Sequence, residues 1–206
     1  MSIVDFSGEV VYTIIIMNTN MIYAGIGARE TPSEILTVME SISLNLGNAG
    51  WKLRSGGAIG ADSAFQCGIK DLPKLKEKQE IYLPWNNFNY NLACDDIGVY
   101  VPTHHQFMKA EPLTRKYHSY YDRLTSKARN LMIRNAFQLL GINLDNPVAM
   151  VICYTENGKI KGGTGQALRI SKDYNIPIYN LGNSECLSKI DEYVNQWCNK
   201  SEIVDF

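Results

Sequence analysis

Three glycine-rich segments hold most of the residues of this chain that could do chemistry. The first reads GIGARETP and spans residues 25–32. Glycine lets the backbone approach a ligand closely and adopt positive φ, while Thr31 and Pro32 suit the cap and the first residue of a helix. Because free amides at a helix N-terminus attract anions, the segment predicts phosphate binding, although a tight strand-to-helix turn would use the same residues. Its candidate contacts are Gly25, Gly27, Ala28, Arg29, Glu30 and Thr31.

The second segment, RSGGAIGAD at 54–62, again stands between a predicted strand and a predicted helix. Asp62 falls in the first turn of that helix. Its carboxylate can either cap the helix or accept hydrogen bonds from a ribose or a base amine. The candidate ligand contacts in this segment are Ser55, Gly56, Gly57, Gly60 and Asp62.

The third segment, KGGTGQA at 161–167, follows an apolar strand and opens another helix. Its candidate contacts are Gly162, Gly163, Thr164, Gly165 and Gln166. In an open parallel sheet, ligands sit at the carboxyl ends of the strands. Because each of the three segments follows a strand, we expect them to converge on one phosphate-bearing ligand.

A long helix predicted over Arg123–Leu140 adds polar candidates. At about 100° per residue, five polar side chains share a sector predicted to face solvent: Arg123, Lys127, Asn130, Arg134 and Gln138. Arg129 and Asn135 lie in the apolar arc and need buried partners. We expect Arg129 to hold the neighbouring insertion, and Asn135 and Arg134 to contact the ligand. Trp85, which follows a strand, either stacks on a base of the ligand or is an aromatic side chain at the rim of the site without a role in binding.

Short apolar runs alternate with helical patterns along the chain. This alternation predicts an α/β fold, a Rossmann-like open, mostly parallel sheet with helices on both faces. Strands are expected at Ile22–Ile26, Trp51–Leu53, Glu80–Leu83, Pro147–Tyr154 and Ile176–Asn180. Helices are expected at Pro32–Asn48, Ile59–Ile69, Arg123–Leu140, Gly165–Tyr174 and Glu185–Trp197. Residues 1–20 form an N-terminal extension in which Val10–Met17 is a possible edge strand, and residues 21–206 form a single domain with an insertion at about 84–122.

The composition is that of one globular domain. The chain has 206 residues, 45% of them hydrophobic, and a formal net charge of −1, which does not favour nucleic acid as the partner. Five cysteines without zinc-site spacing indicate reduced, mostly core thiols, no metal site and a cytoplasmic protein. The longest apolar run is too short to span a membrane, and no motif points to a cofactor.

Residues 104–134 depart from this overall charge. They contain seven Lys and Arg against Glu111 and Asp122, a local charge of +5, together with all three histidines and a cluster of tyrosines. A solvated basic face, a flap over an anionic ligand and a nucleic-acid patch all fit this composition. The adjacent His104 and His105 do not form a metal site, because successive side chains diverge on a helix or strand.

Five stretches together resemble the SLOG superfamily, the Rossmann-like proteins that include the DprA/SMF and LOG types. They are GIGARETP at 25–32, LRSGGAIGAD at 53–62, EIYLPW at 80–85, ARNLMIRNAFQLLG at 128–141 and GGTGQALRIS at 162–171. The resemblance covers about residues 21–182 and is greatest to the YpsA/YspA-like nucleotide-binding branch of phages and bacteria. Ala28 stands where that branch has Ser, which removes one potential phosphate contact.

The resemblance implies a nucleotide-derived ligand, such as a nucleotide or an ADP-ribose- or NAD-like molecule, and a homo-oligomer, dimeric or larger. LOG phosphoribohydrolases cleave N-glycosidic bonds with the Glu of a PGGxGTxxE motif. In the matching stretch here, Gln166 follows the last glycine and Arg169 stands in the next turn, so that Glu is missing. An enzyme would have to use Glu30 or Asp62 instead.

Two further functions follow from the same resemblance. A SLOG domain that binds without turnover could act as a phage sponge that sequesters an antiviral nucleotide signal. DprA-like proteins bind single-stranded DNA, which makes such binding an alternative for this chain.

Overall fold

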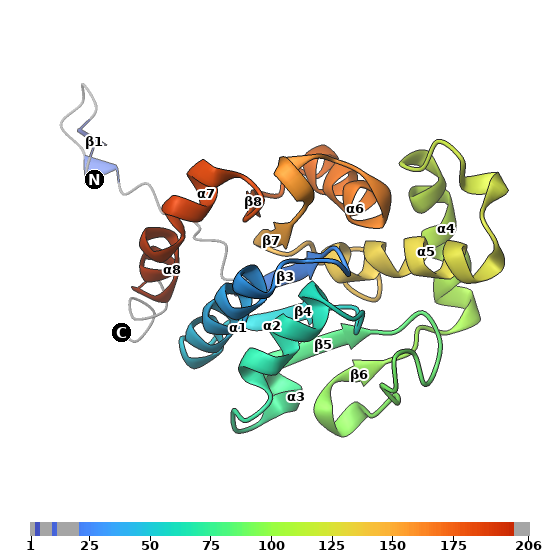
Figure 1. Ribbon diagram of the computed structural model, residues 1–206, viewed down its shortest axis with the longest axis horizontal. Coiled ribbons are helices and arrows are strands. Elements are labelled where there is room, and N and C mark those ends of the chain that lie inside the picture. Colours follow the sequence, from blue (N-terminus) through green and yellow to red (C-terminus); the bar gives the residue numbers. More distant parts are fainter. Residues whose placement is uncertain (1–2, 5–9, 12–20, 200–206) are drawn as a thin grey trace.

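The computed structural model describes residues 3–4, 10–11 and 21–199. A central sheet of six parallel strands has the order β6-β5-β4-β3-β7-β8 (Figure 1). Its strands are β3 (Ile22–Gly27), β4 (Lys52–Ser55), β5 (Gln79–Tyr82), β6 (Val99–Tyr100), β7 (Met150–Tyr154) and β8 (Ile178–Asn180). The predicted α/β fold with an open parallel sheet is therefore confirmed.

Helices cover both faces of the sheet (Figure 1). On one face lie α1 (Ser33–Asn48), α2 (Ala61–Ile69) and α8 (Ile190–Asn199), and on the other α5 (Ser126–Leu140) and α6 (Gly162–Asp173). The remaining helices are α3 (Leu75–Lys78), α4 (His104–Lys116) and α7 (Ser184–Ser188). Short 3₁₀ turns occupy Asp95–Ile97, Tyr121–Arg123 and Glu156–Gly158. None of the helices in this part of the chain is both long and apolar enough to cross a membrane.

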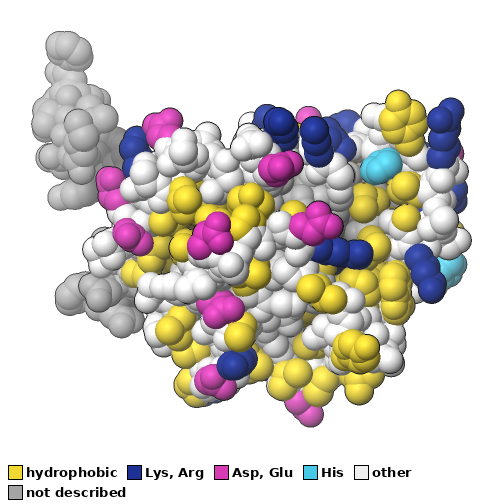
Figure 2. Space-filling view, in the orientation of Figure 1, with side chains coloured by type: hydrophobic (Ala, Val, Ile, Leu, Met, Phe, Trp, Pro, Cys, Tyr) yellow, Lys and Arg dark blue, Asp and Glu magenta, His cyan; other side chains and the backbone are white. Residues whose placement is uncertain are grey.

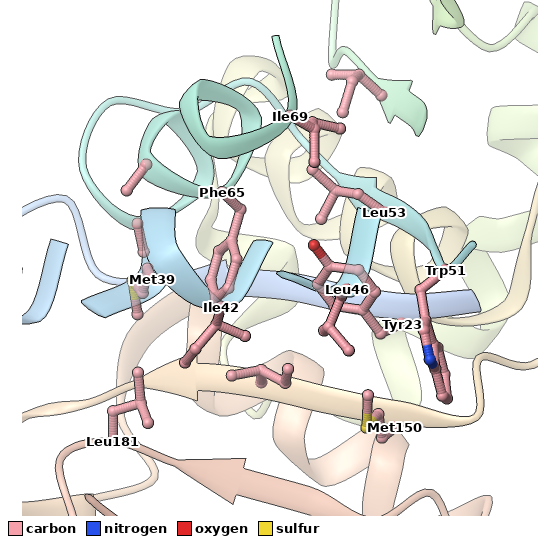
Figure 3. Close-up of a cluster of buried hydrophobic side chains, with 14 of the residues drawn as sticks. Tyr23, Met39, Ile42, Leu46, Trp51, Leu53, Phe65, Ile69, Met150 and Leu181 are labelled. Carbon is pink, nitrogen blue, oxygen red and sulfur yellow. The ribbon is translucent and has the colours of Figure 1, made fainter. Parts of the chain in front are cut away.

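Side-chain alternation along the strands creates two cores. Tyr23 packs with α1 and α2, whereas its neighbour Ala24 faces α5 and α6, as expected for a strand buried on both sides. The first core is lined by the predicted apolar face of α1, which comprises Ile35, Met39, Ile42 and Leu46. Figure 3 shows Met39, Ile42 and Leu46 next to Phe65 of α2 and to the strand residues Tyr23 and Leu53. The helical period read from the sequence is confirmed here.

The N-terminal extension is described only in part. β1 (Ile3–Val4) pairs antiparallel with β2 (Val10–Val11) in a separate two-stranded sheet. The rest of Val10–Met17 lies outside the described residues, so its expected place at the edge of the main sheet stays a prediction.

The insertion at 84–122 has its own secondary structure. It contains β6 and α4, neither of which the apolar pattern predicts. β6 has only two residues, and α4 contains Pro112. A capping box marks the start of α4, since Thr103 accepts from the amide of Gln106 and the Gln106 side chain accepts from the amide of Thr103. That pairing was a usable sequence signal.

Other expectations need correction. α5 begins at Ser126 rather than at residue 123, because the Thr125 side chain caps it. The closing helix is two helices, α7 and α8. All five cysteines are free, but Cys153 alone is buried, while Cys67 is exposed and the others are half-buried. The expectation of mostly core thiols is wrong, because three of them lie on helices that bury only one side.

Candidate functional site

A pocket of about 340 Å³ opens at the carboxyl edge of the sheet. The chain runs outward from β3 through β6 and then returns to place β7 on the other side of β3, so β3 and β7 flank a topological switch point, the usual ligand position in such sheets. The pocket is lined by Ile26, Gly27, Ala28, Arg29, Ala58, Asp62, Leu131, Met132, Arg134, Asn135, Gln138, Lys161, Gly162, Gly163, Thr164 and Ala167. The three glycine-rich segments therefore do converge.

The first segment supplies backbone and one cation to this pocket. Ala28 and Arg29 line it, and Glu30 lines a neighbouring hollow. Thr31 does not cap the helix as expected: its hydroxyl donates to the Ala28 carbonyl over 2.8 Å, and Pro32 occupies the N-cap position of α1. The segment bends back on itself before the helix starts, and Thr31 holds that bend.

Two glycines of this segment are required for packing. A Cβ on Gly25 would lie 2.5 Å from the Phe65 ring, and a Cβ on Gly27 would lie 2.6 Å from the Ala61 Cβ. Both glycines let α2 approach β3 closely. Gly25 stands outside the pocket lining, whereas Gly27 belongs to it.

The second segment packs closely against the first. Gly60 has a φ of 90°, and a Cβ there would lie 2.4 Å from the Arg29 carbonyl oxygen. The Ser55 hydroxyl is fully buried and donates to the Gly25 carbonyl over 2.7 Å, so it links β4 to β3. Gly57, with a φ of 66°, accepts hydrogen bonds from Asn89 and Asn91 of the insertion. Ser55, Gly57 and Gly60 therefore shape the loop and do not line the pocket.

Asp62 and Arg134 form a buried ion pair at the base of the pocket. Arg134 donates from Nη1 to Asp62 Oδ2 over 2.9 Å, and the two side chains are 7% and 4% exposed. Burial raises the pKa of the Asp62 carboxyl, an effect that Arg134 and the amides of Ala58 and Gly56 oppose. Gly56 makes the pair possible, since a Cβ there would lie 1.1 Å from Arg134 Nη1.

The third segment is the first turn of α6 itself. α6 begins at Gly162, three residues before the predicted start at Gly165. The first backbone hydrogen bond of the helix runs from the amide of Gly165 to the Lys161 carbonyl over 2.8 Å. The amides of Gly162, Gly163 and Thr164 come before this bond and therefore have no acceptor within the helix. Gly162 has a φ of 60° with open space where a Cβ would be. Gly165 is instead needed for packing, because a Cβ there would lie 2.7 Å from the Ile160 carbonyl carbon.

A polar network along α5 ties the second segment to the third. Asn135 donates to the Gly163 carbonyl over 3.1 Å and to Gln166 Oε1 over 2.9 Å. With its amide turned to suit its neighbours, Gln138 donates to Asn135 Oδ1 and accepts from the Gly56 amide and Arg134 Nη1. Gln166 is fully buried and stands outside the pocket lining. Asn135 lines the pocket, and its amide group also takes part in this network; its contact with a ligand stays a prediction.

The predicted solvent-facing sector of α5 is wrong over its second half. Arg134 and Gln138 are buried, because Gly56 of the second segment and Asp62 of α2 pack against them. Arg129 behaves as expected, since it donates to the backbone carbonyl of Asp122 in the insertion over 2.8 Å. Leu131, Met132 and Lys161 line the pocket although the sequence patterns did not single them out.

The charges around the pocket favour an anion. Arg29 and Lys161 are exposed, and neither makes an ion pair within residues 21–199. In the view of Figure 2, Lys and Arg side chains gather over the upper right of the molecule, where α4, α5 and α6 lie in Figure 1. Trp85 lines neither the pocket nor the neighbouring hollow; its ring packs edge-on against Phe88, with Lys127 above it.

The neighbouring hollow has a volume of about 430 Å³ and shares Ala28, Lys161, Gly162 and Thr164 with the pocket. Its other lining residues are Glu30, Pro32, Tyr154, Thr155, Glu156 and Lys159. The N-terminus of α6 therefore stands between two adjoining depressions.

No family model and no curated protein matches this chain at the sequence level. Among solved structures, DNA processing protein A from Helicobacter pylori, described for its single-stranded DNA binding mode, is 16% identical, with a TM-score of 0.53 over 88% of this chain and 80% of that one. The two chains share a fold. The Moco carrier protein from Chlamydomonas rheinhardtii is 14% identical over 85% of this chain and 84% of its own, with a TM-score of 0.44. Membership of the YpsA/YspA-like branch thus stays an expectation.

Proposed function

We propose that the pocket at the carboxyl edge of the sheet binds the phosphate of a nucleotide-derived small molecule. The observation that carries the proposal is the convergence of three amides at the start of α6 with two cations, Arg29 and Lys161, that make no ion pair in the described chain. Amides at a helix N-terminus and unpaired cations both attract phosphate. Arg134 adds positive charge beneath them, partly neutralised by Asp62.

The rest of the ligand lies against the apolar wall of the pocket. Leu131, Met132 and Ala58 provide a surface suited to a base, next to the polar edge formed by Asn135. The main role of Asp62 in this proposal is to hold Arg134, because its buried Oδ2 accepts from Arg134 Nη1 and from the Ala58 amide. Binding without turnover would suit a protein that sequesters a nucleotide signal, as the SLOG resemblance implies.

Calorimetry against a panel tests the proposal. The panel contains AMP, ADP, NAD, ADP-ribose and cyclic dinucleotides, and we expect at least one compound to bind tighter than about 1 mM, a binding free energy near −4 kcal/mol. Replacement Lys161→Met should weaken that compound about tenfold or more, since it removes a charged phosphate contact. The control Lys172→Met changes an exposed lysine at the other end of α6. Absence of binding by every compound overturns the proposal.

A second candidate function is hydrolysis of an N-glycosidic bond. Glu30 favours it, because this exposed carboxylate lines the hollow beside the phosphate site and makes no ion pair in the described residues. A general acid or base must come within hydrogen-bond reach of the scissile centre. Incubation with AMP and NAD should then release free base, and Glu30→Gln should stop the release. Unchanged substrate after long incubation rejects this function.

Single-stranded DNA binding is the third candidate, and the fold shared with DNA processing protein A favours it. Exposed Lys and Arg of residues 104–134 and the exposed Tyr120 would supply charge and stacking. Such binding weakens steeply as salt rises. An oligonucleotide that shows no mobility shift even at low salt removes this candidate.

A further inference from the structure

A smaller pocket of about 180 Å³ lies between α4 and α5, two helices in contact with each other (Figure 1). Residues three, four and seven positions apart line it on each helix, from His104 to Glu111 on α4 and from Ser126 to Ile133 on α5, and Tyr121 of the 3₁₀ turn between the helices completes the lining. It shares no lining residue with the two depressions at the start of α6. Pockets for drug-sized ligands measure about 300–1,000 Å³, so this one suits a smaller molecule.

The pocket holds one carboxylate and one guanidinium that do not pair with each other. Glu111 makes a 3.6 Å contact with Arg115, four residues later, and a partly exposed pair of this kind is weak in water. Arg129 donates to the Asp122 carbonyl, and it makes no ion pair within residues 21–199. Two opposite charges that line one small pocket without meeting suit a ligand that carries both.

Buried polar atoms beside these charges also lack partners. Tyr121 Oη and Arg129 Nε are buried, and neither makes a hydrogen bond of normal geometry in the described part of the chain. Burial and the Glu111 carboxylate raise the pKa of Tyr121 to about 12, so its hydroxyl keeps its proton and can donate. The Arg129 guanidinium carbon lies 5.5 Å from the centre of the Tyr121 ring, an attractive contact that holds it beside this hydroxyl. Polar atoms of a ligand would relieve the cost of leaving these groups unpaired.

The rest of the lining narrows the class of ligand. Phe107, Met108 and Ile133 form an apolar wall, and the Met108 side chain is 58% exposed. Glu111 disfavours a phosphate in so small a space, whereas an uncharged apolar molecule would leave both charges unpaired. Ser126 stands in the first turn of α5, where the helix dipole favours a carboxylate.

We infer that the pocket between α4 and α5 binds a free α-amino acid with an apolar side chain. Its carboxylate lies against Arg129 and Ser126, its ammonium group against Glu111, and its side chain against the apolar wall. The inference does not depend on the proposed phosphate site, because no residue belongs to both.

Calorimetry with L-leucine, L-methionine and L-phenylalanine tests the inference. At least one of them should bind tighter than about 1 mM. Two analogues of that amino acid then test each charge separately: the deaminated acid lacks the ammonium group, and the amide lacks the carboxylate. Each analogue should bind at least about tenfold weaker than the amino acid, because it leaves Glu111 or Arg129 without a partner.

Replacement Glu111→Gln tests where the ammonium group lies. This variant should weaken the amino acid at least about tenfold, and it should not weaken the deaminated acid, which has no group for Glu111 to bind. Glu40→Gln, a change of an exposed carboxylate on α1 outside the pocket, is the matched control and should alter neither affinity. Thermal unfolding of both variants checks that the fold is retained.

The outcomes bear on this pocket alone. Failure of all three amino acids to bind overturns the inference and leaves the phosphate site standing. Equal binding of an amino acid and its deaminated acid also overturns it, since the ammonium group would then go unrecognised. An affinity for the amino acid that Glu111→Gln leaves unaltered places the ligand elsewhere on the protein and rejects the assignment.

Discussion

Replacement Gly163→Asp tests whether the start of α6 is a phosphate site or only a turn. Gly163 is the second residue of α6, and its amide precedes the first bond along the helix. An aspartate there places a carboxylate in the space that a phosphate would fill. Two like charges about 4 Å apart, at an effective dielectric constant of about 20, repel by roughly 4 kcal/mol, about a thousandfold in affinity. Screening by solvent reduces this value, so we expect a loss of at least about a hundredfold.

The same replacement should leave the fold intact. The atom nearest to a new Cβ is Met132 Cε at 2.9 Å, the mobile end of a flexible side chain. An acidic residue in the first helical turn also interacts favourably with the helix dipole, by about 0.3–1 kcal/mol. The melting temperature of the free protein should therefore stay within about 3 °C of the parent value.

The assay combines calorimetry, with the tightest-binding compound of the panel, and thermal unfolding of the free protein. Gly163→Asn is the matched control, because it adds nearly the same volume without the charge, and its loss of affinity should be at least ten times smaller. Unaltered affinity in the aspartate variant refutes the reasoning. So does a large drop in melting temperature, which would mean that Gly163 only turns the chain.

Three further predictions follow from other contacts. Burial raises the pKa of Glu80, but Arg54, Lys52 and the Tyr82 hydroxyl together lower it below its ordinary value, so Glu80→Gln should cost about 2–3 kcal/mol at pH 7. That cost should fade as the pH drops through the lowered pKa, because protonated Glu80 no longer pairs with Arg54; a cost that persists at pH 2 in urea titrations contradicts the pairing. Gly60→Ala should lower the melting temperature by about 4–8 °C, since its positive φ and its contact with Arg29 exclude a Cβ; an unchanged transition in calorimetry refutes this. Static light scattering should give a homo-oligomer, and a single mass near the 23.2 kDa of one chain rejects that expectation.

Periodic features of this chain were predictable from the sequence. The repeat of Ile35, Met39, Ile42 and Leu46 identified α1 and its buried face, because helix geometry alone brings these residues together. The alternation of strands and helices predicted the parallel sheet, and therefore also the edge of the sheet where the glycine-rich segments meet.

Features that depend on distant partners were not predictable. Arg134 and Gln138 share a sector with solvent-facing residues, and their burial depends on Asp62 and Gly56, more than 70 residues earlier in the chain. Thr31 is a residue type that often caps helices, but its hydroxyl donates a hydrogen bond to the carbonyl of Ala28, three residues earlier. In both cases a local pattern allowed two partners, and tertiary packing selected one of them.

The close packing of the first two glycine-rich segments against each other has a consequence for the kinetics of binding. The Gly60 backbone lies against the Arg29 carbonyl, and the Ser55 hydroxyl links β4 to β3. Two walls of the pocket are therefore already in place before a ligand arrives, so little ordering of the chain accompanies binding. Association should then be a single step whose observed rate rises linearly with ligand concentration, without the plateau that a slow opening or closing motion imposes.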